Sequence, residues 1–539
     1  MSTTPNPAVV LHRLSFAWPD GSPALTNLEA TFHATRTGLT GANGAGKTTL
    51  LRLIAGELKP TAGSITLKGR VSYLPQHLTL RTHTQVADLL GIRARLDALR
   101  ALEGGDPDPR HFETIGDDWD IETAAQAVLA GIGLGELDLD RLVGTLSGGE
   151  VMLVALAGLR LARTEVVLLD EPTNNLDQAA KERFYEVVQT WRGALVVVSH
   201  DVALLNLMQE TAELFAGALS VFGGSFDQYQ EHLAGEQAAA EQALRAAEQR
   251  LKTEQRQKTE AEARLARRSR YGRAQAEKGG IPKIVLNQRK SDSQAAAGKL
   301  RGELDQRVDS ARQALEYQAT RVRTETKIRI QLPDPEVPTK RRLAELRDAS
   351  GTSILLQGPE RLALTGPNGI GKTRLLETLI HPELTAERPV YALRHTERIG
   401  YLPQRLDHLD DATTLFDAVR RAAPTSSPHQ VRANLARFLF RGQSIDRRVG
   451  ELSGGERFRA ALAHLLLADP PHQLLVLDEP TNNLDLSSVN ELVEALEAYH
   501  GGLIVVSHDA SFLNRLGINL WVTLNHDGST PYLLAHANV

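Results

Sequence analysis

The chain has 539 residues, of which 42% are hydrophobic and 24% charged, with a net charge of −5; these values are typical of a globular protein with about three or four domains. It contains no cysteine, which excludes disulfides, cysteine-ligated zinc and iron–sulfur clusters. The N-terminus lacks the features of a signal peptide, and no apolar run approaches the ~20 residues of a membrane-spanning helix, so we expect a cytoplasmic protein without a membrane segment.

A glycine-rich loop is the first motif with a defined chemistry. Residues 41–48 read Gly-Ala-Asn-Gly-Ala-Gly-Lys-Thr, and residues 366–373 read Gly-Pro-Asn-Gly-Ile-Gly-Lys-Thr. In such a loop the backbone N–H groups surround nucleotide phosphates at a distance that only glycine permits, the lysine adds positive charge, and the threonine hydroxyl binds Mg²⁺. Because the loop occurs twice with the same flanking motifs, we predict two sites for ATP and Mg²⁺.

Two carboxylates and a histidine follow each loop. In each copy an apolar strand ends in an Asp-Glu pair, and a histidine lies 29 positions after the Glu: Asp170, Glu171 and His200, then Asp478, Glu479 and His508. The aspartate can reach Mg²⁺, the glutamate can polarise the attacking water, and the histidine can orient that water against the γ-phosphate. A single Asp-Glu pair is more often a solvated surface pair, but the repetition beside two phosphate loops favours a catalytic role.

The order of the motifs indicates a tandem duplication. Three further segments recur: Tyr-Leu-Pro-Gln at 73–76 and 401–404, Leu-Ser-Gly-Gly-Glu at 146–150 and 452–456, and Asp-Glu-Pro-Thr-Asn-Asn-Leu-Asp at 170–177 and 478–485. Short apolar runs bounded by helical stretches, such as 194–198 and 503–506, indicate buried parallel strands. We therefore predict an α/β fold with two tandem nucleotide-binding domains, residues 1–230 and 331–539.

Residues 231–330, between the copies, are rich in strong helix formers. Apolar residues recur there at steps of three and four, which gives one stripe on each arm: Ala240, Leu244, Ala247 and Leu251, then Leu300, Leu304, Val308, Ala311, Leu315, Ala319 and Val322. Gly-Gly-Ile-Pro at 279–282 interrupts both arms. We predict a long antiparallel helical hairpin whose first helix, Glu231 to Arg270, extends over about 60 Å.

The repeated motifs resemble those of the ATP-binding-cassette superfamily, in which the Leu-Ser-Gly-Gly-Glu signature binds the γ-phosphate held by the opposite domain. The first ATP site that this resemblance implies has the catalytic residues Glu171 and His200, the magnesium ligands Thr48, Gln76 and Asp170, and the ATP-binding residues Gly41, Asn43, Gly44, Gly46, Lys47 and Thr49, completed by Ser453 and Gly455. The second ATP site has, in the same roles, Glu479 and His508, then Thr373, Gln404 and Asp478, then Gly366, Asn368, Gly369, Gly371, Lys372 and Arg374, completed by Ser147 and Gly149.

Trp18 stands where the superfamily stacks an aromatic ring on adenine, and the alternative interpretation is a half-buried core aromatic. The second domain shows no clear counterpart. The adenine contacts of the second ATP site therefore stay open.

Twin cassettes, no membrane segment and a helical linker of about a hundred residues resemble the ABC-F family, which acts on ribosomes. Its usual Asp-Glu-Pro-Thr-Asn-His-Leu-Asp stretch occurs twice, with Asn175 and Asn483 in place of the histidine. The resemblance implies cassettes at the ribosomal exit site and a linker directed toward the P-site tRNA, so that ribosomal RNA and tRNA are the expected partners. Two roles stay open: regulation or rescue of translation, and protection of ribosomes against antibiotics.

The predicted hairpin tip is basic. Residues 264–301 contain eleven Lys or Arg against Glu277 and Asp292, a net charge of +9 within an acidic chain. A charge run is usually a solvated face, yet a basic tip on an acidic protein is the pattern expected for phosphate-backbone contact. The residues predicted to contact nucleic acid are Arg267, Arg268, Arg270, Lys283, Arg289 and Lys290.

The first copy also carries an insert. Residues 77–145 number 69 against 47 for the equivalent 405–451, and the excess is predicted at about 90–122 as a short arm rich in Asp and Glu. An acidic arm would suit a ribosomal protein, and a surface loop without a partner is the alternative.

Two other classes of protein compete with this interpretation. An ATPase subunit for separate membrane subunits would explain both ATP sites but not the basic hairpin. A DNA-repair or chromosome ATPase is disfavoured, because the repair type carries cysteine zinc sites and the chromosome type places its coiled coil inside one cassette, whereas both copies here are complete on either side of it.

Overall fold

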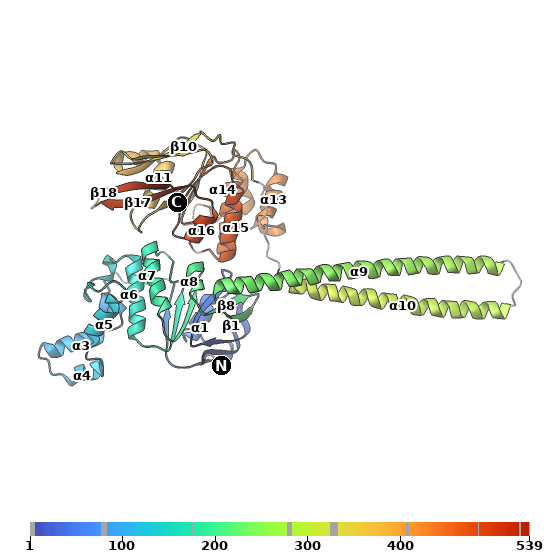
Figure 1. Cartoon of the computed structure of the whole chain (residues 1–539), viewed down its shortest axis with the longest axis horizontal. Coiled ribbons are helices and arrows are strands. Elements are labelled where there is room, and N and C mark those ends of the chain that lie inside the picture. Colours follow the sequence, from blue (N-terminus) through green and yellow to red (C-terminus); the bar gives the residue numbers. More distant parts are fainter. Residues whose placement is uncertain are drawn as a thin grey trace. The chain divides into compact units, whose positions relative to one another are not determined.

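The computed structural model describes residues 6–76, 83–174, 176–277, 283–323, 332–404, 409–482, 484–527 and 530–537. The chain divides into two compact units, one made of Met1–Phe226 with Lys327–Val539 and the other of Asp227–Thr326. Figure 1 shows sheets with covering helices in the first unit and two long helices in the second. The part of the chain before the long helices is called the first domain and the part after them the second domain.

The first domain is built on a mainly parallel six-stranded sheet, in the order β5-β6-β7-β3-β8-β9, where only β9 runs antiparallel to its neighbour. A smaller antiparallel sheet has the order β2-β1-β4. The strands are β1 (Pro7–Ala17), β2 (Pro23–His33), β3 (Arg36–Gly41), β4 (Ala62–Leu67), β5 (Val71–Leu74), β6 (Val166–Asp170), β7 (Ala194–Val198), β8 (Glu210–Phe215) and β9 (Ala218–Gly223). The helices are α1 (Lys47–Ile54), α2 (Val86–Leu89), α3 (Arg93–Glu103), α4 (Pro109–Ile115), α5 (Ile121–Ala130), α6 (Gly148–Leu161), α7 (Gln178–Gln189) and α8 (Val202–Asn206), with a short 3₁₀ turn η1 (Val143–Thr145).

The central strands are covered on both faces. Val166 and Leu168 of β6 belong to a core shared with β1, β2 and α1, while Val167 and Leu169 belong to a second core shared with α6 and α7. Successive side chains of a strand point to opposite faces of its sheet. A strand that is buried on both faces therefore has an uninterrupted apolar sequence, and this pattern is the one from which the buried strands were predicted.

The second domain repeats this architecture, with strand orders β14-β15-β16-β12-β17-β18 and β11-β10-β13. The strands are β10 (Arg342–Asp348), β11 (Ser353–Gln357), β12 (Arg361–Thr365), β13 (Val390–Arg394), β14 (Ile399–Leu402), β15 (Leu474–Asp478), β16 (Gly502–Val506), β17 (Leu520–Asp527) and β18 (Thr530–Ala537). The helices are α11 (Lys372–Ile380), α12 (Leu415–Ala422), α13 (Pro428–Arg437), α14 (Gly454–Leu466), α15 (Leu486–Glu497) and α16 (Ala510–Arg515), with 3₁₀ turns η2 (Pro382–Glu387), η3 (Gly442–Asp446) and η4 (Val449–Glu451). The predicted α/β fold is confirmed in both copies.

The second unit is a helical hairpin, as predicted. Helix α9 (Phe226–Glu277) and helix α10 (Lys283–Arg321) lie side by side and antiparallel (Figure 1). Near the base of the hairpin the Gln237 amide exchanges two hydrogen bonds of 3.0 Å with the backbone of Arg323, and further along Lys258 forms an ion pair of 2.6 Å with Asp305. Helix α9 is longer than the predicted Glu231–Arg270.

The predicted apolar stripe is wrong at two positions of α10. Leu304 and Ala311 are buried, but Leu300 and Ala319 are exposed, and Gln318 takes the half-buried position beside Ala319. A seam between two helices needs alternating steps of four and three, since it follows 3.5 residues per turn. The predicted stripe contained two successive steps of four at each of these places. Two such steps carry the side chain away from the face that contacts the partner helix.

The arm of the first domain is formed by α3 and α4. Arg100 joins it to the domain through hydrogen-bonded ion pairs with Glu122 (2.9 Å) and Asp140 (2.7 Å). Two of its acidic residues are paired locally: Asp118 with Arg95, and Asp106 with His111. The positive charge of Arg95 therefore offsets part of the negative charge that the residue count in the sequence suggests.

Candidate functional site

Each phosphate loop connects a central strand to a helix. Gly41 ends β3 and Gly366 directly follows β12, with φ of 145° and 143°, and a Cβ on either would lie within 2.5 Å of a carbonyl oxygen of the adjoining strand. The helices α1 and α11 then begin at Lys47 and Lys372. Their N-terminal N–H groups and helix dipoles favour a phosphate at this place.

The two loop lysines fold back over their own loops. Lys47 Nζ donates to the carbonyl oxygens of Gly41 (2.6 Å) and Ala42 (3.1 Å), and Lys372 Nζ makes the equivalent bonds of 2.7 and 3.1 Å to Gly366 and Pro367. Both lysines are buried. Burial lowers the pKa of each, and neighbouring carboxylates, Glu171 and Glu479 first among them, oppose that shift.

The candidate catalytic groups leave the sheet at one edge. Asp170 is in register with Val198, and the Glu171 N–H donates to the Val198 carbonyl over 2.8 Å. Glu171 and Glu479 have φ of 49° and 47°, a left-handed conformation that is strained for a residue with a side chain. Strained backbone of this kind is often found at functional positions, and here it occurs at the equivalent glutamate of both domains.

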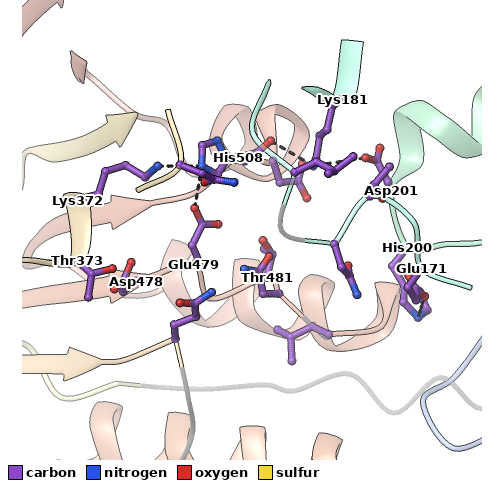
Figure 2. Close-up of a pocket in the computed structure, with 18 of the residues that line it drawn as sticks. Glu171, Lys181, His200, Asp201, Lys372, Thr373, Asp478, Glu479, Thr481 and His508 are labelled. Atoms are coloured by element: carbon purple, nitrogen blue, oxygen red, sulfur yellow. Dashed lines mark hydrogen bonds and ion pairs between the residues drawn. The ribbon is translucent and has the colours of Figure 1, made fainter. Parts of the chain in front are cut away.

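Each histidine lies between the glutamate and the loop lysine. His200 Nε2 is 3.3 Å from both Lys47 Nζ and Glu171 Oε1. In the second domain His508 Nε2 is 3.0 Å from Lys372 Nζ and 3.4 Å from Glu479 (Figure 2). Burial is the largest cause that lowers the pKa of His200 to about 3 and that of His508 to about 4. Both imidazoles are therefore neutral at physiological pH.

The oxygen groups at the second loop fit a magnesium ion. Figure 2 shows Thr373 beside Asp478, and a hydrogen bond joins their side chains. Asp478 Oδ2 is buried without a hydrogen-bond partner among the described residues, and burial raises the pKa of this carboxyl group. Mg²⁺ is typically held by one or two protein oxygens together with phosphates.

A cavity of about 490 Å³ brings together residues of both domains. Its lining includes these predicted site residues: Asn43, Gln76, Glu171, His200, Asn368, Gly369, Gly371, Lys372, Thr373, Arg374, Gln404, Asp478, Glu479 and His508. A volume of this size is in the range of small-molecule sites. The cavity thus gathers ten predicted residues of the second ATP site and four of the first, and its lining does not include Lys47, Thr48 or Asp170.

Two aspartates that sequence reasoning did not select connect the domains. Asp485 accepts a hydrogen bond of 2.7 Å from the backbone N–H of Asn43, and Asp177 accepts one of 3.5 Å from that of Asn368. Each aspartate also caps the helix that follows it, α15 or α7. Their recurrence at the end of the repeated octapeptide was a signal that could have identified them.

Several other predicted residues do not line this cavity. Ser147 and Ser453 are exposed and cap the N-termini of α6 and α14, where each accepts from the backbone N–H three residues later. Trp18 is 39% exposed and packs edge-on against Phe16 at 5.1 Å. Arg267, Arg268 and Arg270 are exposed on α9. Some predicted positions, or their side chains, lie outside the described residues. These are Asn175, Asn483, residues 279–282, Lys283, Arg289 and Lys290.

We expect Gly366→Ala to abolish nucleotide binding at the second loop. The added Cβ would lie 2.3 Å from the Leu524 carbonyl oxygen, and the φ of 143° is one that alanine avoids. The strain should lower stability by about 1–3 kcal/mol. Fluorescent-nucleotide titration and thermal melting would measure both effects. Gly351→Ala, which also has a positive φ but has nothing within 4 Å of its Cβ, is the matched control and should retain binding.

Comparisons with known proteins agree with this geometry. The family model described as ABC transporter matches residues 25–174 and 350–482. The tylosin resistance ATP-binding protein TlrC of Streptomyces fradiae is 33% identical, over 96% of this chain and 97% of that protein. The energy-dependent translational throttle protein EttA of Escherichia coli K12 is 29% identical, over 95% and 91%, and ABC transporter F family member 5 of Arabidopsis thaliana is 28% identical, over 89% and 70%.

Among solved structures, one titled RNase-L Inhibitor is similar with a TM-score of 0.55 and 20% identity, over 98% of this chain and 89% of that one. At this identity the similarity establishes a shared tandem-domain fold. In the part of the chain that the structure describes, no helix combines the length and apolar character required to cross a membrane.

Proposed function

Because the chain belongs to the ABC transporter family and is a tandem-cassette ATPase of the ABC-F type, we propose that it is a cytoplasmic, ribosome-binding translation factor driven by ATP. Two ATP molecules would close the cassettes, the closed form would bind the ribosome, and hydrolysis would release it. The full-length similarity to TlrC and EttA carries the proposal, because it includes the hairpin as well as both cassettes.

The residues of each site have distinct roles in the proposed hydrolysis. Glu479 would accept a proton from the attacking water, and neutral His508 would hold that water in line with the γ-phosphate. Lys372 and the N-terminus of α11 would bind the phosphates. Thr373, Asp478 and Gln404 would hold Mg²⁺, which offsets negative charge on the phosphates when bound. The first ATP site has the same groups, with Glu171, His200, Lys47, Thr48, Asp170 and Gln76 in these roles.

The signature residues would complete each site from the other cassette. Ser147 and Gly149 lie at the N-terminus of α6, and Ser453 and Gly455 lie at the N-terminus of α14. A helix N-terminus capped by a serine offers N–H groups and a hydroxyl to an anion. We therefore assign the first pair to the second ATP site and the second pair to the first.

The printed names of two relatives support a ribosomal role. One is named for resistance to tylosin and the other as a translational throttle. Regulation of translation and protection against an antibiotic are both within this proposal. Co-sedimentation with ribosomes tests it: the protein should pellet with a non-hydrolysable ATP analogue and stay in the supernatant with ADP. Equal pelleting in both states would contradict an ATP-driven factor.

The hairpin is proposed to contact ribosomal RNA or tRNA. Arg264, Arg267, Arg268 and Arg270 are exposed on the far part of α9. Changing these four to Gln should weaken ribosome binding and reduce the dependence of log Kd on log salt by about one unit for each phosphate that the variant no longer neutralises. Pelleting at several salt concentrations measures both quantities.

The matched control changes four basic residues nearer the start of the same helix. These are Arg245, Arg250, Lys252 and Arg256, which are also exposed. This variant should bind ribosomes with nearly the original salt slope. If both variants show the same reduction in affinity and slope, the contact is a diffuse charge effect and the tip has no special role.

A further inference from the structure

A lysine of the first domain contacts the second ATP site. Lys181 lies on α7, four residues after Asp177, and its Nζ donates a hydrogen bond of 3.5 Å to the backbone carbonyl oxygen of His508. The same Nζ is 3.4 Å from Asp201 Oδ2, and the side chains of Lys181 and Asp201 are only 14% and 12% exposed. Figure 2 shows Lys181 placed between Asp201 and His508. His508 is the residue whose imidazole lies against Glu479 and Lys372.

The internal repeat is broken at this position. When Asp177 is aligned with Asp485, Lys181 corresponds to Val489, which also lines the cavity. A valine side chain cannot donate a hydrogen bond or carry charge. The histidine–lysine and histidine–glutamate distances agree within 0.3 Å between the two domains. Among the described groups of the two sites, Lys181 is therefore a chemical difference without a counterpart.

The charge of Lys181 reaches both catalytic groups of the second ATP site. Burial, Lys372 and Lys181 together lower the pKa of His508 to about 4. Burial raises the pKa of Glu479 to about 7, and Lys372 and Lys181 oppose this rise. At the first ATP site burial raises the pKa of Glu171 to about 8, with Lys47 as the opposing cation and with Asp170 and Asp201 adding to the rise.

We propose that Lys181 is a positioning residue which the first domain supplies to the second ATP site, and that it makes the two sites inequivalent. The inference rests on the proposed function, since it concerns hydrolysis by Glu479 and His508. Lys181 fixes the backbone of His508 only while the two domains are in contact. Hydrolysis at the second ATP site is thereby linked to domain closure through a contact that the first ATP site lacks.

Single-site variants separate the two sites. In Glu171→Gln only the second ATP site turns over, and there Lys181→Met should lower kcat by about tenfold while KM for ATP changes less than about twofold. The substitution removes the 3.5 Å hydrogen bond from a charged donor to the His508 carbonyl oxygen, and Lys181 touches no predicted nucleotide contact. Lys181→Arg should restore most of kcat, since a guanidinium can donate to the same carbonyl oxygen.

In Glu479→Gln only the first ATP site turns over, and Lys181→Met should change its rate less than about twofold. Asp201, next to His200, also accepts a hydrogen bond of 2.6 Å from the Tyr185 hydroxyl and one of 3.2 Å from the Leu204 N–H. The position of Asp201 therefore does not depend on Lys181. Arg183→Met, which removes an exposed positive charge from the same helix, is the matched control and should affect neither background.

Each result decides the inference. A tenfold loss of kcat confined to the Glu171→Gln background, with rescue by arginine, supports it. Equal losses in both backgrounds, or a change in KM alone, would overturn it and leave Lys181 a stabilising contact between domains or a binding residue. Turnover that persists in Glu171→Gln/Glu479→Gln would contradict the proposed function itself, and it is separate from every outcome for Lys181.

Discussion

Changing Glu171 and Glu479 together to Gln is expected to lower ATP turnover by about a thousandfold while both nucleotides stay bound. Glutamine keeps the size of the side chain and its hydrogen-bonding reach, but it cannot accept a proton from water. The backbone at both positions is already held in a left-handed conformation, so the substitution should not displace it. Phosphate release and retained radiolabelled ATP measure the two effects.

In cells the same double variant should bind ribosomes in the closed form and stop protein synthesis. Incorporation of a labelled amino acid after induction reports this directly. Glu182→Gln combined with Glu497→Gln removes two exposed carboxylates from the equivalent helices α7 and α15 and is the matched control. Normal growth with a folded, ATP-bound double variant would count heavily against a ribosomal function.

Ser147→Arg is expected to injure the second ATP site and spare the first. A bulky cation at the N-terminus of α6 would block the donors that we propose the signature offers to the γ-phosphate, and loss of such donors costs about a hundredfold or more in rate. Turnover should fall by that factor in the Glu171→Gln background, where only the second ATP site is active. In the Glu479→Gln background it should change by less than about threefold.

The control for this prediction separates capping from catalysis. Ser147 caps α6, and its loss costs about 1 kcal/mol of helix stability as well. Ser427 caps α13 with the same capping-box geometry but lies in no predicted site. Ser427→Arg should therefore lower thermal stability and leave turnover unchanged in both backgrounds. If Ser147→Arg injured the first ATP site instead, the assignment of signatures across the domains would be wrong.

The phosphate loops and the carboxylates beside them could be predicted from the sequence because they depend on residue types at short, fixed spacings. A glycine-rich loop before Lys47 or Lys372 dictates a phosphate cradle through the backbone itself. An uninterrupted apolar run indicates a strand whose two faces are both covered by other elements. When such a run ends in Asp-Glu, the carboxylates lie at the end of a buried strand. Duplication then removed the ambiguity that each motif has alone.

The hairpin shows where reading from the sequence becomes less exact. The alternation of helix formers and apolar residues predicted two antiparallel helices, and this was correct. Which residues form the seam depends on the pitch that two helices adopt in contact, and so Gln318 rather than Ala319 faces inward. The polar pair Lys258 and Asp305 is a cross-helix contact that no single-helix pattern could indicate.

The sequence by itself determined the α/β fold, the two phosphate loops and the strand-end carboxylates, because these follow from local spacing and from repetition. Only the tertiary structure decided which residues meet across the two domains. Asp177, Asp485 and Lys181 lie 191, 442 and 327 positions from their partners in the other domain. Their contacts arise from packing between surfaces distant in the sequence, which leaves no periodicity in the chain. The role proposed for Lys181 is of this second kind. The sequence shows a lysine where the other copy has a valine, and only the structure shows its contact with His508.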